Sequence, residues 1–220
     1  MSTPESTLEI ERKYAVDAGF VMPDLSGVPG ATAVTSPRTY HLTAIYWDTP
    51  GLHLAAAHIT LRRRSGGTDD GWHLKLPAGA SARREVHAPL GPGTEGVPDE
   101  LASLASGWTE GGPLRPIARL QTARTVRHLV DEGGQVLAEV ADDEVTGSLP
   151  AEDFGNTPGP GPAARQWQAA TAWREVEVEL GTGPAGLLDE AGRLLLQAGA
   201  RPSPAASKLS QVLASAPRTA

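Results

Sequence analysis

Near its N-terminus the chain reads Leu8-Glu9-Ile10-Glu11-Arg12-Lys13-Tyr14. Side chains alternate between the two faces of a β-strand, so Glu9, Glu11 and Lys13 would share one face and Leu8 and Ile10 the other. Far downstream the same alternation returns in Trp173-Arg174-Glu175-Val176-Glu177-Val178-Glu179-Leu180. Two interpretations are open at this point. Each stretch could be an ordinary amphipathic strand with solvated carboxylates, or both could belong to a barrel that is charged inside and packed under helices outside.

Composition limits the classes of protein to which the chain can belong. Its 220 residues are enough for one large domain or two small ones with a sizeable core. The sequence has no cysteine, no basic-then-apolar leader pattern and no apolar run long enough to cross a membrane. The formal net charge of -7 argues against a uniformly basic nucleic-acid surface. We therefore expect a cytoplasmic protein with no nucleic-acid or membrane partner, and we leave its oligomeric state open.

Period-two patterns and turn residues predict eight or so strands and few helices. The expected strands span residues 7–16, 38–48, 59–64, 72–76, 83–90, 117–131, 136–146 and 166–180. Helices are expected at 98–107, 187–198 and 203–214, a short helix or loop at 22–25, a short helix or turn at 52–58, and a loop at 154–162. This order favours a mainly β (α+β) fold, an antiparallel barrel with helices packed outside. The long, even hairpins favour one domain over residues 1–220.

Most of the expected strands carry charge at one parity. The pairs that share a face are Arg62 with Arg64, Arg83 with Glu85, Thr122 with Arg124, and Glu139 with Asp143, while Lys75 stands alone on its strand. Arg63, Arg84 and Asp142 occupy the opposite parity, so alternation alone does not decide which face is inside. Carboxylates in one enclosure repel each other unless cations offset them. Carboxylates suit Mg²⁺ and Mn²⁺, and Arg and Lys suit phosphate oxygens, so this inventory is typical of a site for a metal-bound polyphosphate.

An ordered series of motifs resembles the CYTH domains, the triphosphate tunnel metalloenzymes. Glu9-x-Glu11-x-Lys13 resembles the family's opening motif, Tyr46-Trp47-Asp48-Thr49 its Tyr-x-Asp-Thr, and Leu61-Arg62-Arg63-Arg64 its Leu-Arg-x-Arg. In family order there follow Lys75, the Arg83 and Glu85 pair, Arg124, Asp143, the Glu175, Glu177 and Glu179 run, and Ser207-Lys208-Leu209, which is similar to the closing Ser-Lys element. The resemblance covers about residues 7–213. Two positions depart from the family pattern: Thr122 replaces a usual basic residue, and His87 a frequent acidic one. Both departures bear on substrate range and catalytic strength.

The resemblance implies an eight-stranded antiparallel β-tunnel with acidic and basic side chains inside. It implies an enzyme that uses Mg²⁺ or Mn²⁺ to hydrolyse a small-molecule triphosphate by a two-metal mechanism, with inorganic triphosphate as the leading expectation. Thiamine triphosphatase, nucleoside triphosphatase and adenylate cyclase activities are alternatives, as is a module that binds polyphosphate without turnover. Bacterial members are sometimes fused to a C-terminal helical CHAD domain, and no such domain is expected within residues 1–220.

The resemblance also implies roles for individual residues. The first metal is expected at Glu9, Glu11 and Glu177. Because Glu175, Glu177 and Glu179 share a face, Glu175 or Glu179 could contribute instead, and Glu175 and Glu177 are favoured. Glu85, Glu139 and Asp143 would hold a second metal and orient the attacking water. The phosphate chain would be held by Lys13, Arg62, Arg64, Lys75, Arg83, Arg124 and Lys208. Three alternatives stay open: Glu139 in an internal salt bridge, Arg83 as the partner of Glu85, and Lys208 on the surface.

Several other residues have a structural interpretation only. Asp48 is expected to end a turn, and Asp142 to face outward. The six histidines show no metal-ligand spacing, and the five tryptophans are too scattered for a stacking platform. Whether the loop at 154–165 closes over the tunnel is a question that its sequence leaves open.

Overall fold

The computed structural model describes residues 5–79, 82–91, 96–151 and 165–216. The strands in these ranges are β1 Glu5–Val16, β2 Ala33–Val34, β3 Arg38–Asp48, β4 Thr60–Ser65, β5 Gly71–Pro77, β6 Ala82–Ala88, β7 Arg115–Val130, β8 Val136–Pro150, β9 Trp167–Leu180 and β10 Arg201–Pro202. The helices are α1 His53–Ala56, α2 Asp99–Ala105, α3 Gly186–Gln197 and α4 Lys208–Ala214, with a 3₁₀ turn over Ser106–Trp108. The predicted mainly β fold is thereby confirmed, and every expected strand is present.

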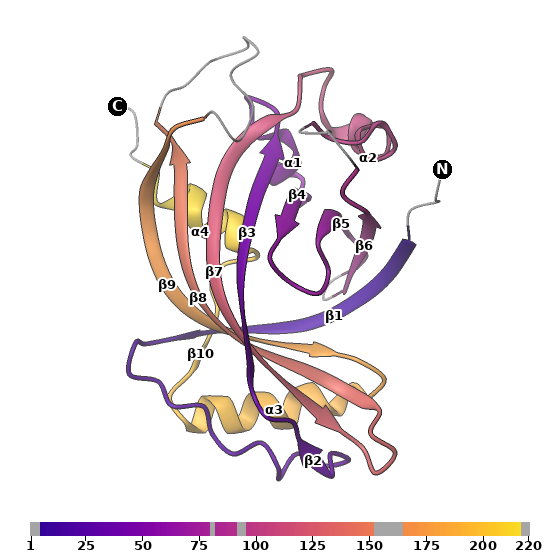
Figure 1. Ribbon diagram of the computed structural model, residues 1–220, viewed down its shortest axis with the longest axis vertical. Coiled ribbons are helices and arrows are strands. Elements are labelled where there is room, and N and C mark those ends of the chain that lie inside the picture. Colours follow the sequence, from indigo (N-terminus) through magenta and orange to yellow (C-terminus); the bar gives the residue numbers. More distant parts are fainter. Residues whose placement is uncertain (1–4, 80–81, 92–95, 152–164, 217–220) are drawn as a thin grey trace.

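Eight of these strands close into an antiparallel barrel. The neighbours follow the order β1-β6-β5-β4-β3-β7-β8-β9, and β9 then pairs back onto β1. The long strands β3, β7, β8 and β9 run side by side as one curved wall (Figure 1). Closure depends on β1 changing partners, because it pairs with β6 as far as Ile10 and with β9 from Glu11 onward. The two stretches with alternating glutamates are therefore hydrogen-bonded neighbours, with Glu11 opposite Glu179 and Lys13 opposite Glu177.

A tight turn explains why β7 and β8 form the longest hairpin of the described chain. The Asp131 carboxylate accepts hydrogen bonds from the backbone N–H groups of Gly133 and Gln135, both at 2.9 Å. Gly134 has a φ of 78°, which a glycine adopts without steric cost. The side chain of Asp131 thus satisfies donors that the turn leaves unpaired, and it fixes the register of the two strands.

Two apolar clusters lie on the outer surface of the barrel. In the first, Leu187, Leu188 and Leu195 of α3 cover Val176 and Val178 of β9. In the second, Trp47, Leu61 and Trp72 pack under Leu101 and Ala105 of α2. These contacts show that the apolar face of the strands lies outside, under the helices, and that their charged face lies inside the barrel.

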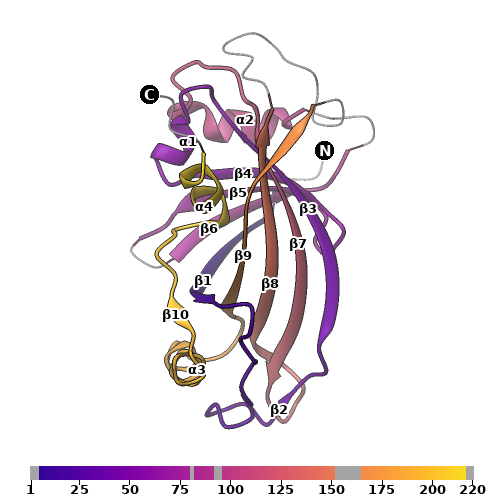
Figure 2. The ribbon, with the colours of Figure 1, turned by 90° about the vertical axis from the view of Figure 1, so that its left-hand side faces the viewer.

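Helix α4 packs differently. Its residues Leu209 and Val212 contact Leu120 and Val145, which share a strand face with the inward-pointing Arg124 and Asp143. A Cβ at Gly147 would lie 2.2 Å from Val212 Cγ2, so the helix needs a glycine beneath it. Figure 2 shows α3 and α4 on the same side of β8 and β9. Helix α4 therefore fills one end of the barrel while α2 and α3 cover its outside.

The structure changes one predicted segment and decides between two alternatives for another. The last helix begins at Lys208 and not near residue 203, because Arg201–Pro202 pairs with Tyr14 and Ala15, and Ser207 caps the helix by accepting the Ser210 N–H at 3.0 Å. Residues 22–25 form no helix but a loop whose Leu25 is buried. The loop expected at 154–162 lies outside the described residues.

Candidate functional site

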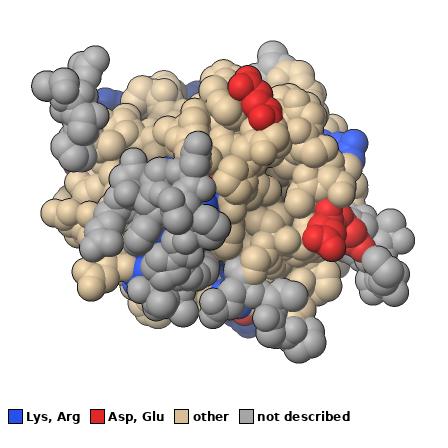
Figure 3. All heavy atoms as spheres, turned by 90° about the horizontal axis from the view of Figure 1, so that it is seen from above, with Lys and Arg blue, Asp and Glu red and all other residues tan. Residues whose placement is uncertain are grey.

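The barrel encloses a charged cavity of about 300 Å³. Its basic lining consists of Lys13, Arg62, Arg64, Lys75, Arg83, Arg124 and Lys208. Its acidic lining consists of Glu9, Glu11, Asp69, Glu85, Glu139, Glu177 and Glu179. The described part of the face seen in Figure 3 is mostly uncharged. Seven cationic and seven anionic side chains thus share one small enclosure.

The lining residues show which face of each strand is inside the barrel, a question that the sequence left open. Glu9, Glu11 and Lys13 all face the cavity, whereas Leu8 is 64% exposed on the other face. Asp142, expected to face outward, pairs outside the cavity with Arg174 at 2.8–2.9 Å. The barrel interpretation is therefore the one that the structure supports over two solvated amphipathic strands.

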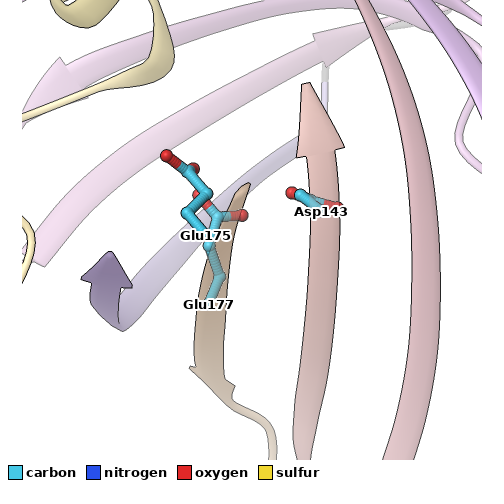
Figure 4. Close-up of side chains that lie close together, drawn as sticks. All are labelled: Asp143, Glu175 and Glu177. Carbon is cyan, nitrogen blue, oxygen red and sulfur yellow. The ribbon is translucent and has the colours of Figure 1, made fainter. Parts of the chain in front are cut away.

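Three carboxylates from two adjacent strands meet beside the cavity, and of the three only Glu177 is part of its lining. Asp143 of β8 and Glu175 and Glu177 of β9 each offer an oxygen, and these oxygens lie within 4.8 Å of one another (Figure 4). Lys208, the first residue of α4, contacts all three carboxylates, at 2.8, 2.6 and 2.7 Å. Burial lowers the pKa of Lys208, but the three carboxylates outweigh it and raise that pKa overall. Lys208 is 9% exposed, so its alternative as a surface lysine is excluded.

Arg124 joins the same cluster from β7. Its guanidinium binds Asp143 through two nitrogens at 2.9 and 2.7 Å and Glu177 at 2.7 Å. Lys13 binds Glu177 as well, and lies 3.0 Å from Glu11. Burial raises the pKa of Glu177, yet Lys13, Lys208 and Arg124 outweigh it and hold that pKa well below its usual value. Glu177 is therefore an anion at any ordinary pH.

A second row of carboxylates follows from the strand register. Glu179 of β9 lies directly opposite Glu11 of β1 on one side and Glu139 of β8 on the other. Like charges directly opposite each other destabilise a sheet unless something offsets them. Burial and the neighbouring Glu11 and Glu139 raise the pKa of Glu179, despite Lys75. Glu139 also contacts His128 at 3.2 Å and Arg124 at 3.9 Å, so its expected internal salt bridge is present.

A third group joins β1, β5 and β6. Lys75 donates to Glu9 at 2.5 Å, and His73 Nδ1 lies 2.9 Å from a Glu85 oxygen. Burial and a hydrogen bond with Glu85 raise the pKa of Glu9 to about 8. Burial raises the pKa of Glu85, but its hydrogen bonds with His73 and Glu9 and the charge of Lys75 lower it overall. Two acids this close hold a proton that a bound cation would displace.

Of the two guanidiniums on β4 that were expected to bind phosphate, Arg62 is short of partners, whereas Arg64 pairs with Asp69. Arg62 donates one long hydrogen bond, 3.4 Å to Tyr46 Oη, and within the described ranges its buried Nε has no partner. Arg64 is 6% exposed, and burial together with Arg62 lowers its pKa to about 9. Arg83 donates to the Ala206 carbonyl at 2.6 Å, a contact that the expected alternatives did not include. These guanidiniums face a cavity in which an anion would complete their hydrogen bonds.

The donor set in the cavity fits a divalent metal. Carboxylate oxygens are the ligands that Mg²⁺ and Mn²⁺ prefer, and the cluster of Asp143, Glu175 and Glu177 brings three of them together.

Sequence reasoning missed two contributors. His73 is 2% exposed and touches Glu85. The sequence could have indicated this, because His73 lies two residues before Lys75 and so shares its strand face. Asp69 lines the cavity from the β4–β5 loop, and no period applies to a loop residue. Asp48 behaves as expected, because its buried carboxylate accepts the N–H groups of Thr49, Leu54 and Ala55 and so caps α1.

Comparison with known proteins agrees with this geometry. The CYTH domain family model matches residues 7–208. Two uncharacterized proteins of Mycobacterium tuberculosis, MT2285 and Rv2226, are each 42% identical over 215 residues, which is 96% of this chain. The chain spans 41% of the length of these relatives.

Solved structures show the same fold. A candidate adenylate cyclase from Bacillus halodurans has a TM-score of 0.62 at 18% identity, over 94% of this chain and 97% of that one. HpAC1 from Hippeastrum, a candidate adenylyl cyclase with a dominant triphosphatase activity, has a TM-score of 0.51 at 17% identity, over 94% of this chain and 95% of that one. Within the described residues, no helix is both long and apolar enough to span a membrane.

Proposed function

This chain belongs to the CYTH family, and from that membership we propose that it hydrolyses inorganic triphosphate in the barrel cavity with the help of Mg²⁺ or Mn²⁺. The observation that carries the proposal is the cavity itself: about 300 Å³, lined by seven cationic and seven anionic side chains. Ligand pockets for drug-sized molecules run from about 300 to 1,000 Å³, so this one suits a small ligand. The cationic and anionic residues of the lining are equal in number. A bound polyanion would therefore need additional positive charge, which metal ions would supply.

The cationic residues would bind the substrate. Arg62 and Arg64 both project into the cavity from β4, but Arg64 pairs with Asp69, so Arg62 is the guanidinium of this strand proposed to bind the triphosphate through its planar fork. Lys75 lies on β5, the strand next to β4, and Lys13 lies on β1; each is already beside a carboxylate. Held between these groups, a triphosphate would lose little freedom on reaching the reactive geometry, and the charge that spreads over its equatorial oxygens would be neutralised.

The carboxylates would hold the metal, and two ions are proposed. Asp143, Glu175 and Glu177 are candidate ligands for one, and Glu9, Glu11 and Glu179 for the other, with Glu85 and Glu139 positioned to orient a water. When bound, such ions would neutralise phosphate charge and lower the pKa of the attacking water. His73 would fix the Glu85 carboxylate, and Lys208 would keep Glu175 and Glu177 in place.

The alternatives require features that the described cavity supports less well. A thiamine or nucleoside triphosphatase, or an adenylate cyclase, needs a surface for an organic ring. Apart from His128, the aromatic side chain in the described lining is Tyr46, whose hydroxyl group is engaged with Arg62. A module that binds polyphosphate without turnover fits the same charges, and only an assay separates it from an enzyme. A cytoplasmic location and the absence of a nucleic-acid partner stay predictions.

A phosphate-release assay tests the proposal. The protein should release phosphate from inorganic triphosphate faster than from ATP or thiamine triphosphate, and only with Mg²⁺ or Mn²⁺ present. Glu11→Gln should abolish release while the circular dichroism spectrum stays unchanged. Glu190→Gln removes an equal charge from an exposed ion pair with Arg193 on α3 and should leave the rate unchanged. Tight binding of triphosphate with no release would favour the binding module, and full activity of Glu11→Gln would reject the metal scheme.

A further inference from the structure

The β4–β5 loop places an acidic side chain on one of the phosphate-binding residues. Asp69 forms an ion pair with Arg64 and lines the same cavity. Its own side chain is 52% exposed, whereas that of Arg64 is 8% exposed. The carboxylate therefore reaches in from the solvent side and covers a guanidinium at the end of β4.

The loop is built to stay in this position. The Asp69 carbonyl accepts a hydrogen bond from His73 Nε2 at 3.0 Å, and the Gly67 N–H donates to Asp70 at 2.9 Å. Gly66 has a φ of 97°, and a Cβ there would lie 2.0 Å from the His41 carbonyl oxygen of β3. Only a glycine permits so close an approach, so the loop is held against the barrel wall.

The chemistry of the pair resembles that of a bound phosphate. A carboxylate and a phosphate oxygen both bind a guanidinium through charge-assisted hydrogen bonds. Arg64 is buried and surrounded by other cations, among them Arg62 and Arg124, which lower its pKa. An anion at this position relieves that repulsion, and Asp69 supplies one from within the chain.

We propose that Asp69 is a specificity-determining residue that occupies the Arg64 end of the cavity and so restricts the site to short phosphate chains. The inference rests on the proposed function, since it names the length of chain that this site accepts. A triphosphate binds to Lys13, Lys75, Arg62 and Arg124 with Asp69 in place. A longer chain reaches Arg64 only by displacing the Asp69 carboxylate, and this displacement costs it affinity.

A binding experiment with two inorganic chains tests the inference. Inorganic triphosphate and inorganic tetraphosphate are titrated calorimetrically into the wild type and Asp69→Asn with Ca²⁺ present, and free phosphate is assayed in the same samples to correct for turnover. Asp69→Asn should bind tetraphosphate about tenfold more tightly than the wild type, since one charge-assisted hydrogen bond becomes available. Its affinity for triphosphate should rise by much less.

Asp70→Asn is the matched control. It removes the same charge one residue away, and its amide oxygen can still accept the Gly67 N–H, so the loop keeps its shape. Asp70 is not part of the cavity lining within the described residues. The ratio of the two affinities should therefore stay at the wild-type value. In an Arg64→Gln background, Asp69→Asn should no longer change the ratio, because its effect acts through Arg64.

The outcomes separate this inference from the proposed function. If the wild type binds triphosphate and the ratio is the same in Asp69→Asn as in Asp70→Asn, the role of Asp69 is rejected and the proposed function stands. If the wild type binds neither chain, both are rejected. A changed ratio in Asp69→Asn that persists without Arg64 would also overturn the inference.

Discussion

Removal of the Lys208 charge should reveal how strongly the barrel depends on one buried cation. Lys208→Met keeps an unbranched apolar stem and deletes only the ammonium group. That group lies 2.6–2.8 Å from oxygens of Asp143, Glu175 and Glu177, in a side chain that is 9% exposed. The variant therefore leaves three carboxylates together in a place that water barely reaches.

The size of the effect follows from the burial. Removing one partner of a buried ion pair costs about 3–5 kcal/mol, because the remaining charge stays desolvated. For a domain of this length 1 kcal/mol shifts Tm by about 2–4 °C, so we expect a loss of roughly 6–20 °C. Arg124 still binds Asp143 and Glu177 at 2.7 Å, which favours the lower part of that range.

Thermal denaturation followed by circular dichroism measures this loss, first in EDTA and then with Mg²⁺ or Mn²⁺. In the variant a divalent cation no longer shares the three carboxylates with the ammonium group, so added metal should raise the Tm of the variant more than that of the wild type. Arg201→Met is the control, since Arg201 pairs with Asp17 on the open surface, where both side chains are more than half exposed. Equal Tm losses in the two variants, or an equal response to metal in Lys208→Met and wild type, would refute the reasoning.

Three further predictions test other parts of the site. In EDTA the stability of the wild type relative to Glu9→Gln should fall as pH rises from 4.5 to about 8, because folded Glu9 keeps a proton that the unfolded chain releases. Urea titrations of both proteins give this difference, from which the opposite contribution of His73, whose pKa burial lowers to about 4, cancels; a difference that does not change with pH would exclude Glu9 as its source. The lowered pKa of Glu85 contributes stability that is lost only below pH 4.5, outside this window. Asp143→Asn should abolish phosphate release, while Asp142→Asn, on the outer face beside Arg174, should retain it; equal rates would contradict the inward assignment of Asp143. Asp48→Ala should lower stability by about 1–3 kcal/mol by leaving buried N–H groups of α1 unpaired, with KM unchanged for any remaining folded enzyme; a normal Tm would show that the cap is dispensable.

Local patterns predicted much of this fold. The strand expected at 38–48 has those bounds, and alternation placed Arg62, Arg64 and Glu177 on the face that proves to be internal. Such predictions succeed because a strand has a fixed period of two, so one inward residue determines the orientation of its neighbours. Asp142 is a charged residue on the opposite, outward strand face, and it has a partner there, Arg174.

Contacts between distant segments could not be predicted in the same way. Nothing in the sequence of β1 marks the position after Ile10 where it leaves β6 and pairs with β9. The convergence of Lys208 on three carboxylates depends on how α4 packs against the barrel, and a lysine at the start of a helix is ordinarily solvated. Asp69 belongs to a loop, whose direction depends on the glycines and neighbours that surround it.

The closure of the barrel by β1 and β9 has a kinetic consequence. Lys13 and Glu177 are hydrogen-bonded although 164 positions separate them in the chain, and contacts of such long range slow folding. The hairpins between β3 and β8 can form early, but the edge of β8 stays open until β9 pairs with it. Open edges recruit strands from other molecules, so refolding yield should decline steeply as protein concentration increases.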